Sequence, residues 1–146
     1  MRFLTDNPAL EPGSVLYTRC TVDLETGGQD MAEVPCRNLE DVLGGFGRSF
    51  QMLAERDIRD AYVDENPLIV NIGLLTGSHA MTGMRSYFSA YSPIKASKKG
   101  WPAAMWSAAS GKFGAKLKWT GLDELVIEKR SAQPVYIVIR DTADGP

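Results

Sequence analysis

The chain has 146 residues, of which 44% are hydrophobic and 23% are charged, and its formal net charge is −2. This length and composition predict one soluble globular domain with a single hydrophobic core, and they exclude an intrinsically disordered chain. The near-neutral charge gives no support for binding to nucleic acid or to an anionic membrane. We therefore expect a single domain over 1–146, with an irregular arm at 1–13, a folded body at 14–141 and a polar tail at 142–146.

The sequence offers few residues for a metal site and no segment for a membrane. No apolar run approaches the roughly 18–20 residues of a spanning helix, and the first residues, MRFLTDNPALEPG, lack the apolar core of a signal peptide, so we expect a cytoplasmic protein. Two cysteines and one histidine are too few for a four-thiolate iron–sulfur cluster or for a site of several histidines. Cys20 sits in an apolar alternation and is expected in the core, whereas His79 is expected in an exposed loop.

The first part of the folded body predicts a β-hairpin. The alternation VLYTRCTVDL within 14–24 is typical of a strand, and Glu25–Gly28 (ETGG) is a turn signal. Met31–Pro35 is then the short returning strand.

A helix is predicted to follow the hairpin. Asn38 is a suitable N-cap, and apolar residues recur at helical spacing at Leu39, Val42, Leu43, Phe46, Phe50 and Leu53. The run Gly44-Gly45-Phe46-Gly47 interrupts this stripe, and each glycine costs a helix roughly 1 kcal/mol relative to alanine. The glycines therefore indicate close approach of another backbone or of a ligand, or a helix broken in its first turn.

The second half of the chain predicts further short strands. They are expected at Pro67–Ile72, Arg85–Tyr91 (ended by Ser92-Pro93), Phe113–Trp119, Leu125–Ile127 and Val135–Ile139, with loops at 74–82 and 95–102 and an ambiguous run at 103–109. In the run FGAKLKW, apolar residues alternate with lysine, which predicts a half-exposed strand with Phe113, Ala115, Leu117 and Trp119 inward. About eight strands and one main helix, without a βαβ rhythm, indicate an α+β domain of mainly antiparallel strands.

Lysines gather in the same half of the chain, at Lys95, Lys98, Lys99, Lys112, Lys116 and Lys118. They indicate either a solvated loop with an edge strand protected by lysines, or a patch that binds a phosphate or an acidic partner. Neither a dinucleotide-binding fingerprint nor a phosphate-binding loop occurs, and no nucleophile–base arrangement is visible. We therefore assign no catalytic and no metal-ligating residue from spacing.

The order of several short motifs resembles a known family. The chain reads VDLETG at 22–27, LGGFG at 43–47 and NPLI at 66–69, followed by GLLTG at 73–77. The matches continue with Ser92-Pro93, Phe113-Gly114-Ala115, Leu117-Lys118, Gly121, Val126-Ile127-Glu128 and Pro134-Val135-Tyr136. Together they resemble, over roughly residues 15–141, the N-terminal domain of the aldehyde ferredoxin oxidoreductase family, the tungsten-pterin enzymes.

The resemblance implies a cofactor platform. In the family this domain is a β-rich base of two similar halves that cradles two pterins, whose dithiolenes hold tungsten. Arg85 matches an arginine that helps to bind the cofactor, and the alternative is an exposed strand-end arginine. A family stretch similar to A-N-S-G-G-x-F-G aligns here with Ser110 and Gly111, and Ala108 replaces its asparagine. The resemblance therefore implies Arg85, Ser110 and Gly111 as cofactor-binding residues, with a tungsten or molybdenum bis-pterin as the cofactor and no iron–sulfur cluster in this chain.

Three functional hypotheses follow. In the first, the chain is a standalone or split-off domain that serves another oxidoreductase chain as a subunit or accessory partner, with either that chain or a second copy covering its exposed face. In the second, it is a piece of a tungsten-pterin aldehyde oxidoreductase and contributes to cofactor binding. In the third, it is a redeployed module that binds another anionic ligand. Because the rest of the family's platform lies downstream, we expect no aldehyde oxidation by the isolated chain.

Overall fold

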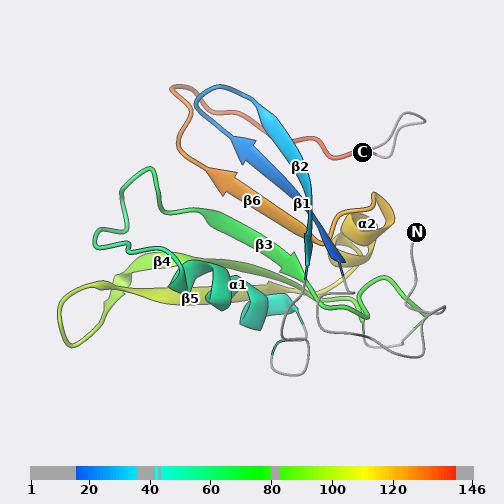
Figure 1. Ribbon diagram of the computed structural model, residues 1–146, viewed down its shortest axis with the longest axis horizontal. Coiled ribbons are helices and arrows are strands. Elements are labelled where there is room, and N and C mark those ends of the chain that lie inside the picture. The colour runs from blue at the N-terminus through cyan, green and yellow to red at the C-terminus, as the bar shows by residue number, and fades with distance from the viewer. Residues whose placement is uncertain (1–15, 36–41, 43, 80–82, 141–146) are drawn as a thin grey trace.

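The protein is described by a computed structural model, which covers residues 16–35, 42, 44–79 and 83–140. One mixed sheet and two helices make up this part of the chain (Figure 1). In chain order the elements are β1 (Leu16–Asp23), β2 (Gln29–Pro35), α1 (Gly45–Ala54), β3 (Leu68–Ile72), β4 (Ser86–Ala96), β5 (Pro102–Ala109), α2 (Phe113–Trp119) and β6 (Glu124–Glu128).

The strands lie in the order β2-β1-β6-β3-β4-β5, so β2 and β5 form the two edges of the sheet. Four of the neighbouring pairs are antiparallel, and β1 and β6 are parallel, with Thr21 opposite Val126. The α+β fold of mainly antiparallel strands is thus confirmed. The predicted hairpin at the start of the chain is confirmed as β1 and β2, in which Cys20 pairs with Met31.

Each face of the sheet has its own core. Helix α1 covers β3 and β4, and its Met52 and Leu53 pack on Ile69 and Val126. On the opposite face, Leu117 of α2 joins a cluster with the buried residues Cys20, Val70, Ile72, Leu122 and Leu125. Cys20 is 6% exposed, which confirms it as a core residue. Among the described residues, no helix is long and apolar enough to cross a membrane.

Helix α1 begins at Gly45, and the expected N-cap Asn38 lies outside the described residues. Gly44 has φ +94°, a left-handed conformation, and forms an isolated antiparallel bridge with Gly73. A Cβ on Gly44 would lie 2.9 Å from the carbonyl oxygen of Ile72, and one on Gly45 would lie 3.0 Å from the ring of Tyr87. The glycine run therefore serves close packing of α1 on the sheet, one of the two uses expected for it.

Strand β4 is longer than expected, because it passes through Ser92-Pro93 and ends at Ala96. Its pairing with β5 shifts register between Ser92 and Ala96. Proline is tolerated in a strand at such an irregularity, where the regular ladder of hydrogen bonds is already interrupted. The ambiguous run 103–109 is β5, the partner of β4.

Phe113–Trp119 is a helix, which corrects the predicted half-exposed strand. Gly114, Ala115 and Leu117 are buried, whereas Phe113 is 44% and Trp119 is 56% exposed. The helix ends at Trp119, and Gly121 just beyond it has a φ of +90°, which allows Leu122 to donate its N–H to the carbonyl oxygen of Leu117 at 3.3 Å. Gly121 was the signal in the sequence for the end of a helix, but the alternation of apolar residues with lysines favoured a strand.

Val135–Ile139 is not a strand, contrary to the prediction from its alternation. Tyr136 is 87% exposed, and the stretch forms no backbone hydrogen bond with the rest of the described chain. Only Ile139 packs on the core cluster of the α2 face. A strand needs a neighbouring strand for its hydrogen bonds, so a β-forming sequence alone is not sufficient.

Candidate functional site

The structure places Arg85, Ser110 and Gly111 at the same end of the β4–β5 pair. Ser86, the first residue of β4, pairs with Ala109, the last residue of β5. Arg85 therefore directly precedes one strand, and Ser110 and Gly111 directly follow the other. All three residues are exposed. The sheet register thus brings together residues that are about 25 positions apart in the sequence, as their assignment to one site requires.

The backbone of Arg85 contacts the loop after β3 and α2, whereas its side chain has no partner among the described residues. Its carbonyl oxygen accepts a hydrogen bond of 3.4 Å from Oγ1 of Thr76. Gly114 of α2 packs so closely that a Cβ there would lie 3.2 Å from the same oxygen. Within the described part of the chain, the guanidinium group forms no hydrogen bond and no ion pair. All its donors are therefore available to a ligand.

The loop after β3 contacts the backbone of Arg85 through Thr76. Thr76 is 4% exposed, and its Oγ1 accepts the N–H of Gly73 at 3.1 Å. Gly77 donates its N–H to the carbonyl oxygen of Gly83 at 2.9 Å and accepts the indole N–H of Trp119 at 3.1 Å. These contacts join the loop to α2 and to the residues that lead into β4. The buried position of Thr76 was not predicted from the sequence.

The connection between β5 and α2 exposes backbone and positive charge. Gly111 has φ +93°, and a Cβ built there would meet no atom within 4 Å. The next residue, Lys112, and Lys116 in α2 are both exposed. Lys118 is instead paired with the carboxylate of Asp123. The site therefore offers hydrogen-bond donors and cations, which suit an anion. Because Lys116 and Lys118 lie in helix α2, these lysines do not protect an edge strand.

Metal-binding side chains do not gather in the part of the chain that the structure describes. In the described ranges, no three histidine, cysteine, aspartate or glutamate side chains are arranged to hold a metal ion. His79 is exposed, as expected for a loop histidine. Burial raises the pKa of the Cys20 thiol, with a smaller contribution from the charge of Asp30. Cys20 is therefore a weakly reactive core residue and not a nucleophile.

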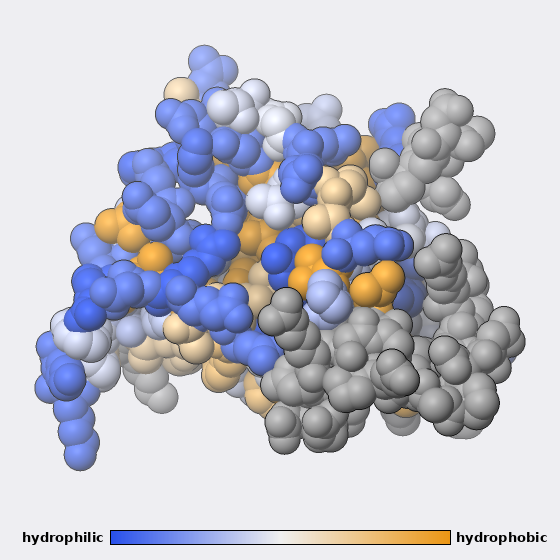
Figure 2. Space-filling view, viewed as in Figure 1, coloured by the Kyte–Doolittle hydropathy of each residue, from blue (hydrophilic) through white to orange (hydrophobic). Residues whose placement is uncertain are grey.

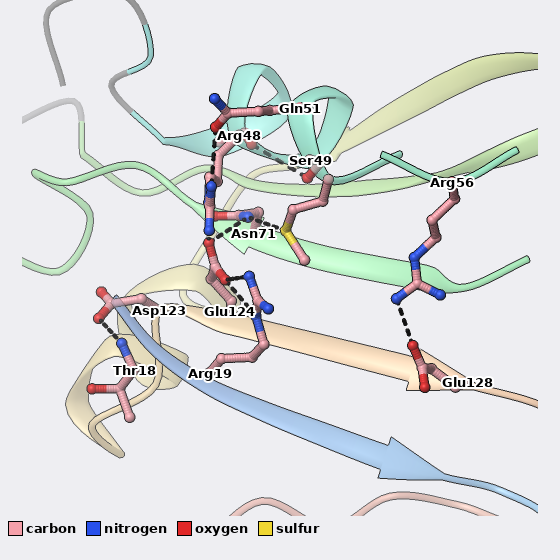
Figure 3. A network of polar contacts seen from close by, with 12 residues as sticks. Thr18, Arg19, Arg48, Ser49, Gln51, Arg56, Asn71, Asp123, Glu124 and Glu128 are labelled. Atoms are coloured by element: carbon pink, nitrogen blue, oxygen red, sulfur yellow. Dashed lines mark hydrogen bonds and ion pairs between the residues drawn. The ribbon is translucent and has the colours of Figure 1, made fainter. Parts of the chain in front are cut away.

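A buried ionic network under α1 was not predicted from the sequence (Figure 3). Glu124 of β6 has no exposed surface, and its carboxylate accepts hydrogen bonds of 2.8 Å from Nε of Arg19 and 2.8 Å from Nε of Arg48. Asn71 donates to the same carboxylate at 3.4 Å. Arg48 also donates to the side chain of Gln51 at 3.0 Å. The network links β1, β3, β6 and α1 through one carboxylate.

Two hollows elsewhere do not belong to this site. A cavity of about 60 Å³ lies between Cys20 and the segment that contains Ile139, and it is far smaller than the ~300–1,000 Å³ of typical ligand pockets. An open depression of about 360 Å³ is lined by Arg59, Pro93 and Pro102. Because it lies at the hairpin end of β4 and β5, it is at the opposite end of these strands from Arg85.

Comparisons with a family profile and with curated proteins both match this chain to aldehyde ferredoxin oxidoreductases. A family profile described as the N-terminal domain of aldehyde ferredoxin oxidoreductase matches residues 19–143. The chain is 34% identical over 124 residues to the tungsten-containing aldehyde ferredoxin oxidoreductase of Pyrococcus furiosus, and 36% identical over 122 residues to that of Thermococcus kodakarensis. Each alignment covers 82% of this chain and 19% of the relative. The chain thus spans about a fifth of the length of these curated relatives.

A solved structure shares the fold. The active site complex BamBC of benzoyl coenzyme A reductase, in complex with 1,5-dienoyl-CoA, contains a chain that superposes with a TM-score of 0.76 at 27% sequence identity. The match covers 87% of this chain and 19% of the other. The similarity therefore extends over nearly all of the present chain and over a small part of a much longer one.

Proposed function

This chain belongs to the aldehyde ferredoxin oxidoreductase family, and from that premise we propose that it supplies a cofactor platform that another polypeptide completes. In this proposal the chain is a subunit or accessory partner of an oxidoreductase and is not catalytic alone. The alignments cover only 19% of each relative, which is consistent with a contribution to part of an enzyme. The family's aldehyde oxidation would then belong to the completed assembly.

One observation carries the proposal. Arg85, whose guanidinium has no partner among the described residues, directly precedes β4 at the strand end where Ser110 and the open backbone of Gly111 directly follow β5. A guanidinium offers a planar fork of donors that suits phosphate oxygens and the polar edge of a pterin. An unpaired arginine on a fixed backbone is suited to a ligand, because its backbone needs no rearrangement when the ligand binds.

The residues fit a pterin cofactor in their chemistry. Arg85, Lys112 and the hydroxyl of Ser110 are donors, and the backbone of Gly111 is open to close approach. The chain's described part offers no protein ligand set for a metal. A tungsten or molybdenum bis-pterin, whose metal would be held by the pterin dithiolenes, would supply the redox chemistry when bound. The role of this chain would be to bind and orient the pterin.

The same donors are also consistent with a second candidate function, the binding of another anionic ligand. Lys112 and Lys116 add exposed positive charge to Arg85, which favours any ligand with several negative charges. Ala108 contributes no polar group where the family pattern has an asparagine. A redeployed module for another anionic ligand would keep the cations and lose the pterin-specific amide. Cofactor analysis separates the two candidates.

The test is the pterin and metal content of the protein purified anaerobically from its host, together with whatever chain accompanies it. Tungsten and molybdenum are measured by mass spectrometry, and pterin by fluorescence after oxidation. We expect Arg85→Ala to lower the retained pterin by about 10–100-fold, because a charged hydrogen bond is worth ~1.5–3 kcal/mol. Arg85→Lys should lose most of the affinity as well, because lysine lacks the planar fork.

Arg59→Ala is the matched control. Arg59 is also exposed, but it lies at the opposite end of β4 and β5, where it pairs with Asp57 and stacks over Trp101. This variant should retain the pterin content of the unmodified chain. The proposal is overturned if neither metal nor pterin accompanies the complex, or if Arg85→Ala and Arg59→Ala behave alike. Retention of a non-pterin anion that depends on Arg85 would establish the second candidate.

A further inference from the structure

Strand β5 forms one edge of the sheet and lacks the charged residues that commonly protect an edge strand. From Pro102 to Ala109 it carries no charged residue, and among the described residues β4 is its only neighbouring strand. The other edge strand, β2, carries Asp30 and Glu33, both exposed. Charges on an edge strand hinder pairing with other chains, and an uncharged edge invites it. The two edges of this sheet thus differ in their readiness to accept another strand.

Aromatic side chains extend the apolar surface beside this edge. Trp106 of β5 stacks on Phe46 of α1 with ring centroids 5.1 Å apart, and Tyr87 of β4 contacts both rings at 5.6–5.7 Å. Trp106 is 45% exposed and Phe46 is 43% exposed, although they pack on each other. Pale orange atoms of hydrophobic residues lie along the lower margin of the molecule, near β5 (Figure 2).

Positive charge lies at both ends of the uncharged strand. Lys98 and Lys99 are exposed in the turn that precedes β5, and Lys112 is exposed three residues after it. If two copies paired antiparallel through β5, the start of each strand would face the end of the other, and Lys99 would approach Lys112 of the second copy. Like charges opposed in this way are unfavourable. The charges therefore favour a partner strand with carboxylates at its ends over a second copy.

We propose that the outer edge of β5 accepts an extended strand from a different polypeptide, with apolar side chains in its middle and acidic residues at both ends. Backbone hydrogen bonds along Pro102–Ala109 would provide affinity in this mode of recognition. Alternate side chains of the added strand would cover Trp106 and Phe46 on one face of the sheet and Met105 on the other. Lysine–carboxylate pairs at the two ends would fix the register.

This inference deepens the proposed function, because it names the surface at which the completing polypeptide binds. It rests on the proposed function in one respect, because it assumes that the added strand belongs to the partner oxidoreductase chain. Strand addition needs no pterin and does not involve the guanidinium of Arg85. A failure of the cofactor test and a failure of the edge test are therefore distinguishable.

Two synthetic peptides test the edge. Both contain the core Thr-Val-Thr-Val-Thr, and one has two glutamates at each end whereas the other has two lysines. Binding is followed by NMR through the backbone amides of β5 and the indole N–H of Trp106. We expect the glutamate peptide to shift these signals and to bind at least about tenfold more tightly than the lysine peptide in low salt, with the difference reduced at 0.5 M salt.

Variants on the two edges supply the control. Met105→Glu adds a negative charge to the exposed strand β5, which repels the acidic peptide, and should abolish binding of the glutamate peptide. Ala32→Glu makes the same kind of change on exposed β2 and should leave binding unchanged. Thermal melts verify that both variants are folded. The inference is overturned if the glutamate peptide does not bind, if it shifts the signals of β2 instead, or if light scattering shows a dimer that Met105→Glu dissociates.

Discussion

The guanidinium of Arg48 in α1 donates a hydrogen bond of 2.8 Å to the carboxylate of Glu124 in β6, which has no exposed surface. Arg19 of β1 approaches the other oxygen of this carboxylate, at 2.7 Å from its Nη2. One buried anion is thus shared by two cations, and it joins the helix to the parallel pair β1–β6. A charge buried in this way is tolerated because its partners satisfy it. Removing the shared carboxylate should therefore leave two arginines without a counter-charge.

Glu124→Gln is expected to destabilise the fold strongly. Removing one partner of a buried ionic network costs about 3–5 kcal/mol, because the remaining charges stay buried and uncompensated. The measurement is urea denaturation followed by circular dichroism, in which the midpoint should fall while the slope stays the same. Since Glu124 does not touch the candidate site, pterin retention by the folded fraction should not change.

Glu128→Gln is the control for this prediction. Glu128 lies in the same strand and pairs with Arg56 at 2.6 Å, but both side chains are about a third exposed. An ion pair of this kind contributes only about 0–1 kcal/mol. Equal losses of stability in the two glutamine variants would show that burial does not decide the energetic weight of these carboxylates.

Two glycine substitutions should have opposite effects. Gly114 and Gly47 both lie in helices, where alanine is favoured over glycine by about 1 kcal/mol. A Cβ on Gly114 would lie 3.0 Å from the carbonyl oxygen of Met84, whereas one on Gly47 would lie 3.7 Å from the nearest side-chain atom. We expect Gly47→Ala to stabilise the protein by about 0.5–1 kcal/mol. Gly114→Ala should destabilise it by about 1–3 kcal/mol, because a backbone carbonyl cannot move aside easily.

Thermal melts of the two alanine variants, compared with the unmodified chain, measure these opposite changes in stability. Because Gly114 also packs on Arg85, its alanine variant should lower ligand retention as well as stability. An equal gain of stability in both variants would show that α2 moves away from Arg85 at little cost, and the support proposed for the site would then be wrong.

The sequence predicted those elements whose signals are local. The hairpin of β1 and β2 was predicted because the turn ETGG lies between two β-forming runs. Phe113–Trp119 was predicted wrongly, since an alternation of seven residues fits a short helix as well as a strand. Val135–Ile139 was also predicted wrongly, because a strand depends on a neighbour that local sequence does not show. In both segments, tertiary context overrode local propensity.

The candidate site was predictable in part. Arg85, Ser110 and Gly111 were selected through the family resemblance, and it was the register of β4 with β5 that placed them side by side. Their role in binding remains a prediction. Nothing in the sequence indicated that Arg19 and Arg48 would meet at Glu124, because these contacts join residues 105 and 76 positions apart. Long-range polar networks leave no periodic signal in a single sequence.

The ion pairs of Lys129 predict a dependence of stability on pH. Its ammonium group contacts the carboxylates of Asp23 at 2.9 Å and Glu25 at 3.0 Å, and the bond to Asp23 is the main reason that the pKa of Asp23 is lowered. Since its pKa is lower in the folded than in the unfolded chain, Asp23 stabilises the fold above its ordinary pKa of ~3.9. This contribution is lost as the pH falls through the folded-state pKa.

The comparison of the unmodified chain with Asp23→Asn measures this effect. The unmodified chain should melt at a higher temperature at pH 7, and the difference should shrink below about pH 4 and in 0.5 M salt. Glu33→Gln, which removes an exposed carboxylate from β2, is the control for the change in net charge. A difference between the chain and Asp23→Asn that stays constant from pH 7 to pH 3 would contradict the prediction.

Ala108→Asn should strengthen pterin binding if the site retains its family role. Ala108 is exposed in β5, two residues before Ser110, and its methyl group offers no hydrogen bond. An asparagine there restores the amide of the family pattern, and one added hydrogen bond of ~0.5–1.5 kcal/mol raises affinity about 2–10-fold. Ser107→Asn is the matched control, since Ser107 is also exposed but points to the opposite face of the strand. Pterin content after anaerobic purification measures both. An equal change in the two variants would mean that the ligand does not reach position 108, and the anion site would then be limited to Arg85, Ser110 and Gly111.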